Sequence, residues 1–141
     1  MGKLLYEDLT YQIRKGCFNI YNSLGFGHKE HVYQKALAKE LNSLKLNFVE
    51  EPILKVKYKE EVVGTYKPDF VIEEKIIVEL KAVEFLPKSF EIQLLYYLKS
   101  TNYQLGLLIN FGSPKLSIKR LVWTSNHPRQ SDPRQSASHP R

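Results

Sequence analysis

Cysteine is nearly absent from this sequence, and long apolar runs are absent altogether. Cys17 is the single cysteine among 141 residues, which excludes an internal disulfide framework and a cysteine-rich zinc site. A reducing, cytoplasmic location is therefore expected. No apolar stretch approaches the roughly 20 residues of a membrane-spanning helix, and the first ten residues, MGKLLYEDLT, lack the apolar region of a signal peptide. We expect no membrane partner.

Acidic residues are fewer than basic ones. The whole sequence holds 21 Lys and Arg against 15 Asp and Glu, a formal net charge of +6. Leaving out the three Arg and one Asp of residues 125–141, 18 basic and 14 acidic residues remain, a surplus of +4. A mildly basic domain fits a nucleic-acid partner, although many small basic domains bind no nucleic acid. The charge alone therefore does not decide the function.

Large apolar side chains are missing from the C-terminal segment. The last 17 residues, SNHPRQSDPRQSASHPR, contain PRQS twice and three Pro. Such a composition cannot bury enough apolar surface to offset the entropy lost on ordering. Residues 125–141 are expected to form a disordered tail, which leaves residues 1–124 as one domain.

Apolar residues follow helical spacing in three segments and strand spacing in five. Helices are expected over residues 7–24, 28–44 and 90–100, the first ended by Gly-Phe-Gly and the last capped by Ser89. Strands are expected over residues 54–58, 62–72, 76–82, 104–110 and 116–123. Pro68 indicates an edge, a bulge or a bend in the second of these strands. This order predicts an α/β fold with a mixed sheet, in which the apolar strand 104–110 is central.

The strand IIVELKA, residues 76–82, carries two opposite charges inside an apolar run. Strand side chains alternate, so Glu79 and Lys81 point to one face and Val78 and Leu80 to the other. If residues 73–75 form a three-residue hairpin loop, Asp69 lies opposite Glu79 with about 5 Å between their Cβ atoms. A two-residue loop would shift this register.

Two carboxylates at this spacing suit a hard divalent cation such as Mg²⁺. A lysine beside the ion can stabilise a hydroxide or the charge that builds on a phosphate. The alternative is a surface pair of Glu79 and Lys81 near the strand end, which would contribute little to stability.

One motif and four blocks of the sequence resemble known families. Pro68-Asp69 followed by Glu79-Leu80-Lys81 resembles the PD-(D/E)XK motif of a large nuclease superfamily. GHKEHVY (27–33) resembles the signature of the bacterial GxxExxY protein family, and three later blocks are similar to that family: VELKAVE (78–84), QLLYYL (93–98) and GLLINFG (106–112). The resemblance covers about residues 8–123. It implies the restriction-endonuclease-like core, α-β-β-β-α-β, with a mixed central sheet flanked by helices.

The resemblance also implies roles for six residues. Asp69 and Glu79 would bind Mg²⁺, or Mn²⁺ in its place, with Glu30 completing the metal site, and Lys81 would assist the nucleophile. Gln93 and Tyr97 resemble the Q-x-x-x-Y motif of recombination helicase-nucleases, which lies beside the active site and substrate. Two alternatives stay open, because Glu30 also suits the first turn of a helix and Tyr97 also suits the core.

These inferences predict a Mg²⁺-dependent nuclease, a hydrolase of phosphodiester bonds, with DNA favoured over RNA as the substrate. A nuclease-like fold that acts on RNA, or as one half of a larger assembly, stays open as an alternative. A further alternative is a catalytically silent module of the same fold that binds nucleic acid or a protein partner. The sequence contains no element dedicated to reading bases, so a homodimer or an accessory protein is expected to supply specificity.

Overall fold

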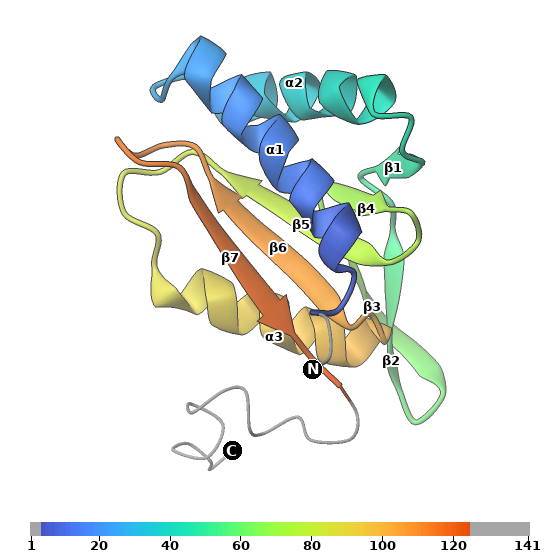
Figure 1. The fold of residues 1–141 in the computed structure, drawn as a ribbon. Helices are drawn as coiled ribbons and strands as arrows, with labels where there is room; N and C mark the ends of the chain where they lie inside the picture. The colour runs from blue at the N-terminus through green and yellow to red at the C-terminus, as the bar shows by residue number, and fades with distance from the viewer. Residues whose placement is uncertain (1–3, 125–141) are drawn as a thin grey trace.

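A five-stranded mixed sheet forms the centre of the fold and has helices on both faces (Figure 1). The computed structural model describes residues 4–124. The strands lie in the order β1 (Phe48–Glu50), β4 (Phe70–Ile72), β5 (Ile76–Lys81), β6 (Leu105–Asn110) and β7 (Ser117–Val122). Only β5 and β6 are parallel in this sheet, and the other neighbours pair antiparallel. The expected α/β fold with a mixed sheet is confirmed.

Each face of the sheet packs on its own helix layer. Helices α1 (Glu7–Leu24) and α2 (Glu30–Ser43) cover one face, and α3 (Lys88–Thr101) covers the other (Figure 1). Val78 and Leu80 belong to the buried cluster of the first layer, whereas Ile77 belongs to the cluster under α3. The alternation of strand side chains therefore turns Glu79 and Lys81 toward the α3 face.

The hairpin of β2 (Leu54–Tyr58) and β3 (Glu61–Tyr66) forms a separate two-stranded sheet. The single strand expected over residues 62–72 is therefore wrong, because the chain leaves β3 at Tyr66 and enters β4 at Phe70. Pro68 lies in the break between them, as the expected bend required. Proline has no N–H to donate to a strand ladder, so the chain changes sheets at this point.

The cap expected at Ser89 is also wrong. Helix α3 begins at Lys88, and Pro87 takes the N-cap position with φ −62° and ψ 143°. The Pro87 carbonyl accepts a hydrogen bond from the Phe90 N–H at 3.0 Å. Because the extended proline already starts the helix, Ser89 lies inside its first turn.

The turn between β4 and β5 has three residues, the length at which Asp69 was expected to lie opposite Glu79. Ile72 pairs with Ile76 and Phe70 with Val78. The Lys75 N–H donates to the Ile72 carbonyl at 3.0 Å. Glu73 and Glu74 both have φ 55°, a left-handed conformation that reverses the chain in a tight loop.

Two sequence predictions concern the C-terminal tail and the absence of a membrane-spanning helix. The tail of residues 125–141 lies outside the described residues, so its disorder stays a prediction. Within residues 4–124, no helix has the length and apolar character needed to cross a membrane.

The segment after β5 is clamped by the end of β6. The side chain of Asn110 is 2% exposed. Its Oδ1 accepts hydrogen bonds from the N–H groups of Val83 and Gly112, and its Nδ2 donates to the Val83 carbonyl, each at 3.0 Å. The Phe111 N–H donates to the Lys81 carbonyl at 2.9 Å. These bonds fix the backbone directly after Lys81.

Gly112→Ala should disrupt this clamp. A Cβ added at Gly112 would lie 2.2 Å from the Val83 nitrogen and 2.4 Å from the Ala82 carbonyl carbon, both backbone atoms that cannot rotate away. Overpacking of this kind costs about 1–3 kcal/mol. Gly64→Ala is the matched control, because a Cβ there meets nothing within 4 Å. Thermal melts of both variants test this, and equal melting temperatures would contradict it.

Candidate active site

Glu79 and Lys81 line a small cavity under α3. Both are half-buried residues at the end of β5. The other lining residues come from α3 and β6, namely Phe90, Gln93, Leu94, Tyr97 and Leu108. Two of these, Gln93 and Tyr97, were predicted from the sequence to lie beside the active site. The structure therefore brings four of the six predicted residues to one cavity.

Asp69 reaches the same strand end from β4. It directly precedes Phe70, which pairs with Val78, so continuation of this register places Asp69 opposite Glu79. Its Oδ2 accepts a hydrogen bond from the Leu80 N–H at 2.7 Å. Burial raises the pKa of the Asp69 carboxyl, while the Leu80 N–H and then Lys81 act to lower it.

Glu30 approaches from the opposite helix layer. It is the first residue of α2, and its carboxylate accepts a hydrogen bond from the Ala82 N–H. Loss of solvent around the carboxyl raises its pKa, Lys81 lowers it, and Asp69 raises it again. Glu30 therefore shares an electrostatic environment with Asp69 and Lys81.

Tyr33 fixes the turn that leads to Glu30. Its hydroxyl donates to the Gly25 carbonyl at 2.6 Å and accepts from the His28 N–H at 3.2 Å. Its ring is fully buried and stacks on Phe111 with centroids 4.4 Å apart. In the block GHKEHVY, the tyrosine thus packs in the core and the glutamate reaches the site.

Tyr66 is a site residue that the sequence analysis missed. Its hydroxyl donates a hydrogen bond to the Oε2 atom of Glu79. The Tyr66 ring stacks on Tyr97 with centroids 3.7 Å apart and an interplanar angle of 4°. The two residues of the hydrogen bond are 13 apart in sequence, and no local pattern links them. One sequence signal for this contact was available: a tyrosine three residues before Asp69. If buried, its hydroxyl would need a polar partner, and the nearby carboxylates could supply one.

Burial strongly raises the pKa of Glu79. Burial is the main reason that its pKa rises from 4.5 to about 7; the hydrogen bond from Tyr66 lowers it and Asp69 raises it, with smaller effects from Lys81 and Glu30. The Lys81 Nζ lies 4.4 Å from the ring centroid of Phe90, a position that favours a cation. The site therefore combines partly buried carboxyls, which resist ionisation, with one ammonium group.

The carboxylates fit a hard divalent cation by donor type. Oxygen ligands are those that Mg²⁺ prefers, and a nearby cation would favour the charged form of carboxyls whose pKa values are raised mainly by burial. As placed in residues 4–124, however, no three Asp, Glu, His or Cys side chains form a group able to hold a metal ion. Each carboxylate instead accepts a hydrogen bond, from Tyr66, Leu80 or Ala82. The metal-binding role of Asp69, Glu79 and Glu30 stays a prediction.

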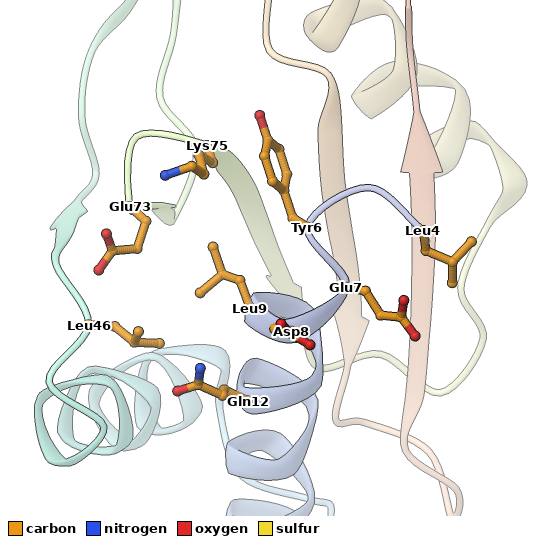
Figure 2. Close-up of a pocket in the computed structure, with 9 residues that line it drawn as sticks. All are labelled: Leu4, Tyr6, Glu7, Asp8, Leu9, Gln12, Leu46, Glu73 and Lys75. Carbon is orange, nitrogen blue, oxygen red and sulfur yellow. The ribbon is translucent and has the colours of Figure 1, made fainter. Parts of the chain in front are cut away.

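A larger hollow lies elsewhere, between the start of α1 and the β4–β5 turn (Figure 2). It has a volume of about 460 Å³ and contains none of the six predicted site residues. In Figure 2 the Leu9 side chain extends into the space between Leu46 and Lys75. We assign it no chemistry.

Comparison with known proteins identifies the family. Residues 7–121 match the family model described as the PD-(D/E)XK nuclease superfamily. No curated protein and no solved structure matches the chain with significance. The match spans most of the 141 residues, so the chain belongs to the PD-(D/E)XK nuclease superfamily. The finer resemblance to the GxxExxY family stays a prediction.

The element order agrees with this assignment. Without the β2–β3 hairpin, the elements from α2 to β6 have the expected α-β-β-β-α-β order, formed by α2, β1, β4, β5, α3 and β6. The β2–β3 hairpin is an insertion between β1 and β4, and β7 extends the sheet.

Glu79→Gln should stabilise the metal-free protein at neutral pH. Because folding raises the pKa of Glu79 from 4.5 to about 7, the folded state holds this proton more tightly than the unfolded state. Stability is therefore lost as the pH rises from 4.5 to 7. Glutamine has no proton to lose and can still accept the Tyr66 hydrogen bond.

The measurement is a series of thermal melts in EDTA across this pH range. The advantage of Glu79→Gln over wild type should be small near pH 4.5 and largest above pH 7. Glu61→Gln, at an exposed position of β3, is the control. If the difference in melting temperature between Glu79→Gln and wild type does not change with pH, the ionisation of Glu79 does not destabilise the fold and this prediction is wrong.

Proposed function

We propose that this protein is a Mg²⁺-dependent nuclease that hydrolyses phosphodiester bonds in DNA. The observation that carries the proposal is the meeting of Asp69, Glu79, Lys81 and Glu30 around the end of β5, in a chain of the PD-(D/E)XK nuclease superfamily. Membership of this superfamily supports nuclease activity. The metal, the substrate and the residue roles are our inference.

Asp69 and Glu79 would hold the cation through carboxylate oxygens, with Glu30 supporting it from α2. A bound divalent cation lowers the pKa of its water and polarises a phosphoryl oxygen. Lys81 lies on the same strand face as Glu79, so its ammonium group would orient the attacking hydroxide and offset charge on the phosphate. Gln93 and Tyr97, on the cavity wall formed by α3, would contact the substrate.

The basic surplus favours a polyanionic substrate, and we propose DNA before RNA. Mn²⁺ should replace Mg²⁺, because both accept carboxylate and water ligands. We also propose that a second copy of the chain or an accessory protein supplies sequence or structure specificity.

One observation favours a second candidate. Each site carboxylate already accepts a hydrogen bond from the protein, which is the arrangement that a catalytically silent module would keep. Such a module would bind nucleic acid or a protein partner through the same fold without turnover.

Cleavage assays separate the two candidates. The full chain is incubated with single- and double-stranded DNA and RNA in Mg²⁺, Mn²⁺ or EDTA. A nuclease should cut DNA in Mg²⁺ or Mn²⁺ and lose this activity in EDTA. Binding without cleavage across all substrates and metals would instead support the silent module.

Lys81→Met should abolish most cleavage and leave DNA binding nearly unchanged. Loss of one positioned electrostatic stabiliser costs about 10²–10³ in rate, whereas one phosphate contact among several contributes little to affinity. Lys81→Arg should also be impaired, since a planar guanidinium places its charge differently from an ammonium. Cleavage rates and binding curves are measured together at one salt concentration. Equal cleavage by wild type and both variants would remove Lys81 from the mechanism.

A further inference from the structure

Tyr66 is the last residue of β3 and is 6% exposed. A phenol buried to this extent needs a partner for its hydroxyl. The partner is Glu79 Oε2, to which the hydroxyl donates. Among the described contacts, this is the one hydrogen bond that links the inserted β2–β3 hairpin to a predicted metal ligand.

The Tyr66 ring is held by its surroundings. It stacks flat on Tyr97 of α3, with centroids 3.7 Å apart. It also belongs to the buried cluster under α3 that includes Leu94 and Leu98, against which Leu54 and Val56 of β2 pack. A ring packed in this way cannot follow Glu79 if that side chain changes rotamer. The hydroxyl therefore acts as a fixed point for the carboxylate.

The same short segment also carries the second carboxylate. Asp69 follows Tyr66 by three residues, and Pro68 between them has a fixed φ that limits the backbone. Asp69 is bonded to the Leu80 N–H at 2.7 Å, and Tyr66 is bonded to Glu79. The segment 66–69 thus bonds to two adjacent residues of β5: Tyr66 to Glu79, and Asp69 to Leu80. These two bonds restrain both carboxylates of the predicted metal pair.

Without a restraint, the like charges of Asp69 and Glu79 would drive the two carboxylates apart. The hydrogen bond from Tyr66 to Oε2 keeps the Glu79 side chain from rotating away from Asp69. It leaves the other oxygen, Oε1, for another ligand. Ligating carboxylates are usually held by such outer hydrogen bonds, and removing one typically weakens metal binding 10- to 100-fold.

We propose that Tyr66 is a positioning residue of this site, which holds Glu79 through Oε2 so that Oε1 is presented to a divalent cation beside Asp69. This inference rests on the proposed metal-dependent function. It assigns the β2–β3 hairpin a role in assembling the site, through the residue at its end.

The test is calorimetric titration of the full-length chain with Mn²⁺ in the absence of nucleic acid. Tyr66→Phe keeps the ring and its stack on Tyr97 but removes the hydroxyl. We expect its Mn²⁺ affinity to fall about 10- to 100-fold. Tyr103→Phe is the matched control, because Tyr103 packs against the same cluster while its hydroxyl lies near Glu74 in the β4–β5 turn. Its affinity should equal that of wild type.

Melting temperatures in EDTA separate positioning from a structural role. If Tyr66→Phe melts lower but binds Mn²⁺ like wild type, Tyr66 only stabilises the fold and the inference fails. Tighter Mn²⁺ binding by Tyr66→Phe would also overturn it, since the hydroxyl would then compete with the cation. If wild type cleaves DNA and binds Mn²⁺, and Tyr66→Phe binds Mn²⁺ with the same affinity, the role of Tyr66 is refuted while the proposed function stands. Wild type that binds no Mn²⁺ refutes the proposed metal-dependent function together with it.

A second variant covers the case in which Tyr66→Phe does not fold. Tyr97→Leu keeps the Tyr66 hydroxyl but removes the ring on which Tyr66 stacks. Because the hydroxyl would then be less firmly held, Mn²⁺ affinity should fall, by less than in Tyr66→Phe. An affinity equal to that of wild type would count against the inference.

Discussion

The constraint on which this structure depends is the cost of placing the Glu79 carboxyl in a half-buried position beside Asp69. Burial and repulsion both oppose its charge and raise its pKa to about 7. Hydrogen-bond donors near the end of β5 offset this cost. The Tyr66 hydroxyl donates to Glu79, and the Leu80 N–H donates to Asp69. The Lys81 ammonium supplies the opposite charge. Tyr66 belongs to β3, Leu80 and Lys81 belong to β5, and Asp69 directly precedes β4, so the site forms only when these three strands are brought together.

Three features of the fold bring these groups together. The three-residue turn after β4 sets the antiparallel register that aligns Asp69 with Glu79. The strand alternation of β5 sends Val78 and Leu80 into one core and the two charges toward α3. The buried side chain of Asn110, at the end of the parallel neighbour β6, then fixes the backbone at Val83. Glu30 can accept the Ala82 N–H because this backbone is held in place.

Much of this could be predicted from the sequence because it depends on local patterns. Helical spacing identified α1 to its exact bounds, and period-two alternation assigned Glu79 and Lys81 to one face. The β4–β5 register followed from the length of one turn. The strand over residues 62–72 failed because a proline break within an apolar run does not reveal that the two halves join different sheets. The Ser89 cap failed because Pro87 could start the helix earlier.

The contacts of Tyr66 and Asn110 could not be predicted, since they join residues 13 and 27 positions apart through side chains. Such contacts leave no periodic signal, and they decide how the acidic groups are held. A carboxylate accepts up to about four hydrogen bonds, so one donor on each of Asp69, Glu79 and Glu30 leaves further lone pairs on every group. The hydrogen bonds therefore stabilise the carboxylates without exhausting them. A cation could add its own bonds to this arrangement instead of first breaking those that hold it, which reconciles the satisfied geometry with a metal-binding role.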